Sequence, residues 1–342
     1  MSDSSATQPP PIVLYHYPAS PYAKRLVWYM QLRGIPYVQC IQPMVMPRPD
    51  LTRLGIKYRR IPLLSIGRDV YLDTRLILQK LEAIYPNLPI LGAAPGTEQK
   101  ALERLLEAKV IDGGIFTSAA LLLPTDLPAV RDPAFQKDRA DYRNGVRMTK
   151  ELAAALRPEA LAEIKAVAAL LETTLLADGR DWLLKTSQPS LADIEAVWPL
   201  HWLSILPGAL PADQVSAKQF PLVFAWIARF QATVSAAAKS RGEKPKVVTG
   251  EEAHATITQS AFHEAGGGGV DASEPIVQSH GLRKGQVVEL WPTDSGSSHK
   301  DVGKLVSLGS GEVVIETGAG VRLHAPRHGF RFHAAGAGGA NL

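Results

Sequence analysis

Three pairs of residues in the first quarter of the chain have the types and spacing to bind an anionic ligand. Ser20–Pro21 and Asp73–Thr74 each suit a helix start, where unpaired N–H groups and the helix dipole attract negative charge. One helix start could hold a thiolate and the other a carboxylate. Between them, Ile61–Pro62 interrupts a strand-like run, and a cis peptide bond there would leave the Ile61 N–H and C=O free to pair with an extended peptide ligand.

The elements that position these pairs can be predicted from apolar periodicity. A buried strand at 12–16 is followed by a helix from Pro21 to Gly34 and a second strand at 37–41. Two further strands meet in a hairpin at Gly67–Arg68, and a helix begins near Thr74 and stops before Pro86. The predicted order is β-α-β followed by β-β-α.

The remaining sequence changes character twice. Alanine- and leucine-rich periodicity without strand-like alternation predicts an all-helical region up to about residue 240. Residues 241–279 lose that periodicity and include Gly266–Gly269, which favours a flexible linker. Short β-rich runs separated by turns then predict a small β-barrel-like module. The predicted domains are a disordered start at 1–10, domains at 11–92 and 93–240, the linker at 241–279 and the β module at 280–335.

Three segments of this sequence resemble the motifs of the glutathione S-transferase family. They are Tyr17–Ala23, Arg60–Leu64 and Asp73–Thr74, and their spacing is similar to that of the tau- and omega-like types, whose first motif reads Ser-Pro-Phe or Cys-Pro-Phe. Later, Ser190 and Asp193 resemble that family's capping box. The resemblance extends from Ile12 to the region of Ala238, and fungal transferase-like proteins look most similar, here with an extra C-terminal β module.

The resemblance implies an α+β architecture with a thioredoxin-like N-terminal domain, an all-α transferase C-terminal domain and then the β module. It implies that Ser20 stabilises the glutathione thiolate and that Ile61, before cis-Pro62, pairs with the cysteinyl backbone. Asp73 and Thr74 would hold the γ-glutamyl end. Arg60 stands where the family often has lysine. Glutathione would be a co-substrate, no metal would be required, and the protein would form a homodimer.

Other readings of single residues stay open. Tyr17 is a rival to Ser20 as the thiolate stabiliser, because a phenol can donate the same hydrogen bond. The only cysteine, Cys40, falls in a predicted strand and is read as a small buried hydrophobe. His324 and His328 could ligate a metal, although surface or turn positions fit them better. Aromatic residues of the helical region could face an acceptor pocket, but helical spacing more often indicates core; they are Phe116, Trp198 and Trp202.

Composition narrows the class of protein. The chain of 342 residues is 46% hydrophobic and 20% charged with a net charge of +4, which gives no reason to expect a nucleic-acid partner. No run is apolar enough to span a membrane, the start lacks a signal peptide, and a single cysteine fits a reducing compartment. We therefore expect a cytoplasmic protein.

Two functional hypotheses follow. The first is an enzyme that activates the glutathione thiol for attack on an apolar electrophile, by conjugation, isomerisation or elimination, in detoxification or secondary metabolism. The second is a non-catalytic protein that uses the fold for binding or dimerisation while the β module recruits a partner. Departures from the family motifs support the second, since Asp73–Thr74 replaces Glu-Ser and Pro47–Arg48 stands where lysine is expected.

Overall fold

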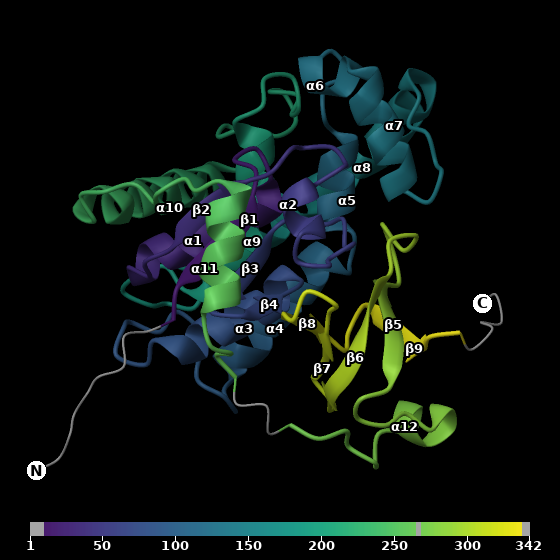
Figure 1. Ribbon diagram of the computed structural model, residues 1–342. Helices are drawn as coiled ribbons and strands as arrows, with labels where there is room; N and C mark the ends of the chain where they lie inside the picture. The colour runs from purple at the N-terminus through teal and green to yellow at the C-terminus, as the bar shows by residue number, and fades with distance from the viewer. Residues whose placement is uncertain (1–9, 265–267, 337–342) are drawn as a thin grey trace, which may run out of the picture.

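The computed structural model describes residues 10–264 and 268–336 (Figure 1). The expected disordered start, except for Pro10, lies outside these ranges, as do Gly266 and Gly267 of the expected linker.

The N-terminal unit has the predicted order of elements plus one short additional helix. Its elements are β1 (Ile12–His16), α1 (Pro21–Arg33), β2 (Val38–Ile41), α2 (Pro49–Thr52), β3 (Leu63–Ile66), β4 (Asp69–Tyr71) and α3 (Thr74–Ile84). Gly34 caps α1 with a left-handed φ of 71°, and Gly67 turns the β3–β4 hairpin with a φ of 57°. Both glycines therefore act where the sequence predicted a helix end and a hairpin.

Helices make up the second unit, in agreement with the predicted all-α region. They are α4 (Glu98–Ile111), α5 (Ile115–Leu121), α6 (Pro128–Arg131), α7 (Pro133–Tyr142), α8 (Lys150–Leu170) with a π-helical turn at Leu171–Leu175, α9 (Leu191–Ser204) and α10 (Pro221–Ser240). The periodic stretch from 133 to 176 is interrupted after α7, where Asn144 and Gly145 both take positive φ. Ser190 and Asp193 form the expected capping box at the start of α9.

The segment expected to be a flexible linker contains ordered helix, so that expectation was wrong for much of its length. Helix α11 (Gly250–Gln259) begins with a capping box between Thr249 and Glu252, and α12 (Pro275–His280) follows. Ala253 and Ile257, one turn apart on α11, are fully buried against the sheet. Burial of this apolar stripe explains why the segment is a helix and not a free tether.

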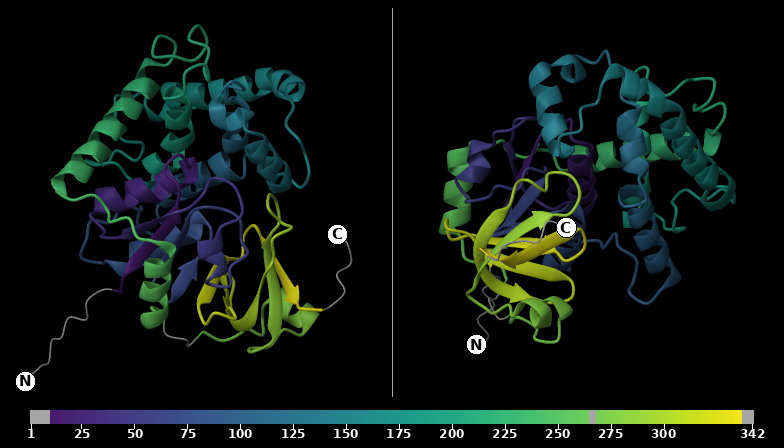
Figure 2. Two further views of the ribbon diagram at one scale, coloured as in Figure 1. Left: turned by 45° about the horizontal axis from the view of Figure 1, so that its top comes forward. Right: turned by 90° about the vertical axis from the view of Figure 1, so that its right-hand side faces the viewer.

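The C-terminal strands are those that the sequence predicted, but they do not form a separate sheet. They are β5 (Val287–Pro292), β6 (Asp301–Leu308), β7 (Glu312–Glu316), β8 (Arg322–Pro326) and β9 (Phe330–Ala334). Strand β8 pairs in parallel with β4, so that one sheet of nine strands has the order β2-β1-β3-β4-β8-β7-β6-β5-β9. We call β5–β9 the β module; it continues the N-terminal sheet (Figure 2).

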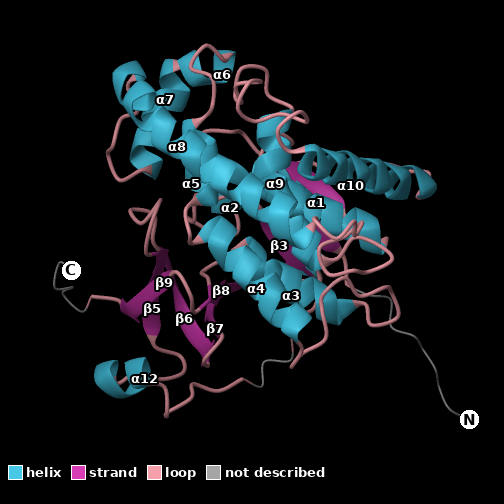
Figure 3. Ribbon diagram, turned by 180° about the vertical axis from the view of Figure 1, so that it is seen from behind, coloured by secondary structure: helices cyan, strands magenta, loops and turns pink. Residues whose placement is uncertain are grey.

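Two hydrophobic cores lie on the two faces of the N-terminal part of this sheet. Leu14 points into the core shared with α1, α3 and the helical unit, which covers that face when the molecule is seen from behind (Figure 3). Its neighbours Val13 and Tyr15 point into the other core, shared with α11 and the β module. The alternation along β1 is the two-residue period of a strand buried on both faces.

No helix within the described ranges is long and apolar enough to cross a membrane.

Candidate active site

Strand register brings the three predicted pairs toward one end of the sheet. Tyr15 pairs with Leu63 in the antiparallel β1–β3 ladder, so two further residues along each strand place Ile61 opposite Tyr17, just before Ser20. Leu64 pairs with Tyr71 in the β3–β4 ladder, which places Pro62 opposite Asp73 in the same way. The start of α1, the turn before β3 and the start of α3 are therefore neighbours.

Ser20 caps helix α1. Its side-chain Oγ accepts a hydrogen bond from the Ala23 N–H at 3.2 Å, and Pro21 occupies the first helical position. The residue is 2% exposed. Because the oxygen is the acceptor in this bond, the hydroxyl hydrogen is left to donate to an anion at the helix start.

The turn before β3 has the geometry predicted for it. The Ile61–Pro62 peptide bond is cis, as is that of Met46–Pro47, which was not predicted. Ile61 lies outside β3 and is half-buried, so its N–H and C=O are not part of the β1–β3 ladder. An extended peptide could pair there with the backbone of Ile61.

The start of α3 is held by arginine side chains. Asp73 caps the helix through a 2.9 Å bond from the Arg75 N–H and also pairs with the Arg75 guanidinium at 3.2 Å. Burial opposes ionisation of Asp73, but the charge and hydrogen bonds of Arg75 outweigh it and lower its pKa. The φ of Asp73 is +62°, an unusual conformation for a residue other than glycine that often marks functional sites.

Thr74 belongs to a buried network that reaches the helical unit. Its Oγ1 accepts a hydrogen bond from Arg25 of α1, whose guanidinium also pairs with Glu195 of α9. Arg25 and Glu195 are both fully buried. This network was not predicted, because nothing in the local sequence links residues 25, 74 and 195.

Arg60 contacts the β module, which the sequence did not predict. Its Nε and Nη2 donate to the carbonyl oxygen of Ser295 at 3.0 and 2.6 Å, and Nη2 pairs with Asp294. Burial disfavours the charge of Arg60, but the surrounding phenols and Asp294 outweigh it and raise its pKa further. The charge of Arg60 also contributes to lowering the pKa of Asp73, so both groups share one electrostatic environment.

The rival readings have structural outcomes of their own. Tyr17 is half-buried, and its hydroxyl accepts a 3.4 Å bond from Arg139 of α7, so it remains an alternative donor next to Ser20. Cys40 is 1% exposed, and burial raises the pKa of its thiol to about 12, helped by Asp50, as fits a buried hydrophobe. Trp198 is fully buried in contact with Tyr22, with ring centres 4.7 Å apart.

The expectation of a surface or turn position was wrong for His324. This residue lies in β8 and is 1% exposed; its Nε2 is 2.9 Å from Asp69 Oδ1 and its Nδ1 is 2.6 Å from Glu312 Oε1. Lys80 Nζ bonds to Glu264 at 2.5 Å and to Glu312 at 2.7 Å, so an ammonium already sits among these carboxylates. The cluster joins β4 to β8 through charge, and we assign no metal to it.

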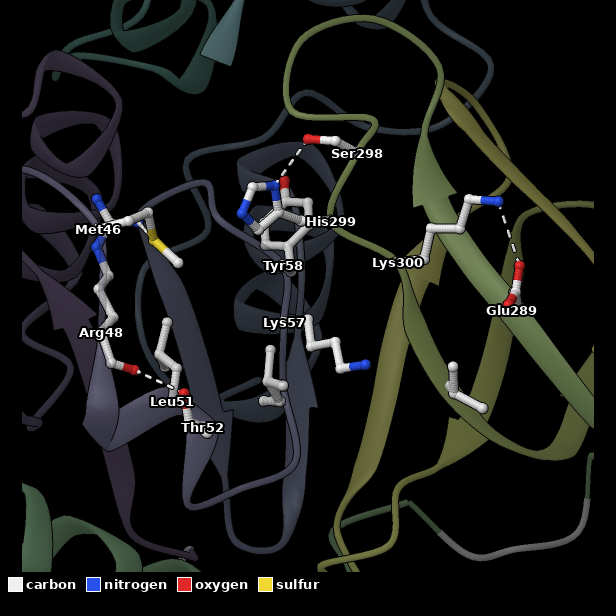
Figure 4. A pocket seen from close by; sticks show the side chains of 12 residues that line it. Met46, Arg48, Leu51, Thr52, Lys57, Tyr58, Glu289, Ser298, His299 and Lys300 are labelled. Atoms are coloured by element: carbon white, nitrogen blue, oxygen red, sulfur yellow. Dashed lines mark hydrogen bonds and ion pairs between the residues drawn. The ribbon is translucent and has the colours of Figure 1, made fainter. Parts of the chain in front are cut away.

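A cavity of about 320 Å³ lies between the segment preceding β3 and the β module (Figure 4). Its lining combines apolar side chains such as Met46 with the basic side chains of Lys57, His299 and Lys300. Ser20, Ile61 and Asp73 are not part of the lining. The cavity is therefore distinct from the place where the three pairs converge.

Comparisons with known proteins agree with this architecture. The family model described as the glutathione S-transferase N-terminal domain matches residues 14–89, and a domain of unknown function, DUF7962, matches residues 118–239. Glutathione S-transferase U1 of Arabidopsis thaliana is 31% identical over 99 residues, which are 29% of this chain and 43% of that protein. Glutathione S-transferase U4 of the same plant is 30% identical over 84 residues, 25% of this chain and 38% of the relative. The match thus spans less than half of these relatives.

Solved structures extend the likeness to the whole fold. A GST-like protein from Pseudomonas syringae superposes with a TM-score of 0.64 at 22% identity, covering 95% of this chain and 99% of that one. The beta-etherase LigF from Sphingobium sp. strain SYK-6 gives a TM-score of 0.51 at 16% identity over 67% of this chain and 99% of that one. At these identities the likeness concerns the fold alone. Residues 14–89 therefore match a glutathione S-transferase N-terminal domain, and the chain as a whole has a GST-like fold.

Proposed function

We propose that this protein binds glutathione and activates its thiol for attack on an apolar electrophile. The observation that carries the proposal is the convergence of the α1 start, the cis Ile61–Pro62 turn and the α3 start at one end of the sheet. Two helix starts and one unpaired backbone segment are suited to an extended peptide that carries a thiolate and a carboxylate. The match of residues 14–89 to the glutathione S-transferase N-terminal domain supports glutathione as that peptide.

Each group has a physical role in the proposal. Ser20 donates its hydroxyl hydrogen to the thiolate, and the positive end of α1 adds to the stabilisation. Ile61 pairs with the cysteinyl backbone next to Pro62. Asp73 and Thr74 hold the γ-glutamyl end, and the charge of Arg60 attracts a carboxylate.

The first chemical step is common to several reactions. A thiol with an ordinary pKa of about 8.5 loses its proton to solvent, and the thiolate electron pair forms a sulfur–carbon bond with the electrophile. Displacement of a leaving group with its electron pair gives conjugation, and a later loss of glutathione gives isomerisation or elimination. Detoxification and secondary metabolism are both compatible with this step.

The direct test compares Ser20→Ala with the wild type. We expect the bound glutathione thiol to titrate below its ordinary pKa in the wild type and to move back toward about 8.5 in the variant, followed by thiolate absorbance. Ser187→Ala is the matched control, because Ser187 is exposed and lies outside the three converging pairs. An unchanged thiol pKa in Ser20→Ala would remove Ser20 from this role and leave Tyr17 as the candidate.

Assembly and location are part of the proposal. We propose a homodimer in the cytoplasm, on the basis of the family resemblance and the single buried cysteine. Light scattering during size-exclusion chromatography distinguishes a dimer from a monomer. A monomer at micromolar concentration would contradict the assembly proposed.

A second candidate function is a non-catalytic binding protein. One observation favours it: Thr74, Asp73 and Arg60 are already engaged by Arg25, Arg75 and Asp294 respectively. A site whose polar groups are satisfied internally has less to gain from a ligand. Glutathione binding without turnover of any electrophile would favour this second function.

A further inference from the structure

A loop of the β module reaches both of the other units. The loop between β5 and β6, residues 293–300, rises from the module toward α7 (Figures 1 and 2). Its base is held by a 3.0 Å bond from the Thr293 N–H to the Gly329 carbonyl oxygen. Its tip contacts Arg60 on the N-terminal unit and the end of α7 on the helical unit. The loop thus bridges the two units beside the candidate site.

The loop contacts the N-terminal unit through the guanidinium of Arg60. The Ser295 carbonyl oxygen accepts from both Nε and Nη2, and the Asp294 carboxylate pairs with Nη2. These two acceptors lie on the edge of the guanidinium that carries Nε and Nη2, the edge able to form a two-pronged bond with a carboxylate. A ligand carboxylate on this edge must therefore displace the loop.

The contact on the helical unit combines hydrogen bonds of neutral groups with one long contact between His299 Nδ1 and Asp141 Oδ2 at 4.0 Å. The Gly296 N–H donates to the Tyr142 carbonyl oxygen at 2.9 Å, and Asn144 Nδ2 donates to the Asp294 carbonyl oxygen at 3.1 Å. Gly296 takes a φ of +76°, and a Cβ there would approach Arg59 Cγ to 2.9 Å. Only glycine permits this close approach. The loop is therefore fitted to this position.

The ion pair is open to exchange. The Asp294 side chain is 67% exposed, whereas that of Arg60 is 17% exposed. An exposed carboxylate remains hydrated and gives little net stabilisation, so another carboxylate can replace it at small cost. The partly buried guanidinium stays in place and changes its partner.

We propose that Asp294 is a specificity-determining residue of the candidate glutathione site. It occupies Arg60 in the free protein, competes with a carboxylate of the incoming ligand and is released with its loop when the ligand binds. This inference rests on the proposed function and deepens it, because it assigns the β module a part in ligand selection. Ligands without a carboxylate at Arg60 leave the loop closed.

Competition by Asp294 and support of Arg60 by Asp294 predict opposite changes in glutathione affinity when the Asp294 carboxylate is removed. If Asp294 instead supported Arg60 in its binding geometry, removing the carboxylate would weaken binding. If Asp294 competes, Asp294→Asn strengthens binding by about fivefold, the factor for removing one unit charge a few ångströms from another near a wet surface. Asp294→Glu keeps the charge and should leave the affinity near that of the wild type.

The experiment is calorimetry of glutathione with the wild type, Asp294→Asn and Asp294→Glu. Asp126→Asn is the matched control, because it removes an exposed carboxylate far along the chain from the loop. Glutathione diethyl ester, which lacks both carboxylates, is the second ligand. We expect the gain in affinity of Asp294→Asn with glutathione only.

Hydrogen exchange is the second measurement. Exchange at residues 293–300 should become faster in the wild type when glutathione is added, and it should already be faster in Asp294→Asn without glutathione.

The outcomes distinguish a failure of the competition by Asp294 from a failure of the proposed glutathione site. Equal or weaker glutathione binding by Asp294→Asn, with the wild type binding, overturns the competition and leaves the proposed function intact. An equal gain for the diethyl ester also overturns it. Binding by neither the wild type nor Asp294→Asn overturns the glutathione site itself, and this inference with it.

Discussion

Arg25 and Glu195 form a fully buried ion pair that joins α1 of the N-terminal unit to α9 of the helical unit. The same guanidinium donates to Thr74 at the start of α3. A buried charge needs its partner, so this pair ties the candidate γ-glutamyl contact to the correct docking of two units. The relative position of the units and the geometry of the site are therefore coupled.

Removing the Glu195 carboxylate should destabilise the folded protein. Glu195→Ala leaves Arg25 charged and buried without its partner, and we expect a loss of about 3 to 5 kcal/mol in unfolding free energy, measured with denaturant. Glu159→Ala, on the exposed face of α8, is the control. A loss below about 1 kcal/mol would show that water reaches Arg25 and that the pair is not a structural tie.

Asp301 should make stability depend on pH. It is buried, its Oδ1 accepts from the Lys57 and Tyr58 N–H groups, and burial raises its pKa from 3.8 to about 7. The folded protein then holds this proton more tightly than the unfolded chain. The contribution to unfolding free energy is complete below about pH 4 and is lost as the pH rises to about 7.

The size of this effect can be measured by denaturation at several pH values. We expect the wild type to lose roughly 2 to 4 kcal/mol between these limits through this group, and Asp301→Asn to remove that part of the slope. Glu316→Gln on β7 is the control. The same slope in Asp301→Asn and the wild type would assign the pH dependence to other groups.

His324 should hold the β module to the N-terminal sheet. Burial disfavours its charge, but the carboxylates of Asp69 and Glu312 outweigh burial and raise its pKa. His324→Ala removes the imidazole that is hydrogen-bonded to two carboxylates, and we expect a loss of about 3 kcal/mol in unfolding free energy and faster hydrogen exchange along β4 and β8. His280→Ala, at the exposed end of α12, should change neither. Unchanged exchange at β4 and β8 would contradict a role for His324 in this junction.

The sequence was most informative where the determinants are local. Gly34, Gly67 and the apolar run at 12–16 each carry the signal for their own element, and the structure has those elements there. The capping box of Thr249 and Glu252 was equally visible, but the glycine-rich stretch after it led to a flexible linker being predicted instead. The error arose because the flexibility expected of Gly266–Gly269 was also assigned to the residues of α11.

Long-range pairing could not be predicted in this way. Asp69 pairs with Arg322 in the β4–β8 ladder, and no local pattern links strands so distant in sequence. His324 was read as a surface residue because its two carboxylate partners come from β4 and β7. The contact between Arg60 and the β5–β6 loop escaped prediction for the same reason.

We propose that the starts of α1 and α3 and the Ile61–Pro62 turn together form a glutathione site. Calorimetry of glutathione with the wild type and Thr74→Ala, with exposed Thr125→Ala as the control, tests it most directly. We predict binding by the wild type and the control, and at least about tenfold weaker binding by Thr74→Ala, the loss expected for one hydrogen bond to a charged group. No binding by the wild type, or equal binding by all three proteins, would contradict the account.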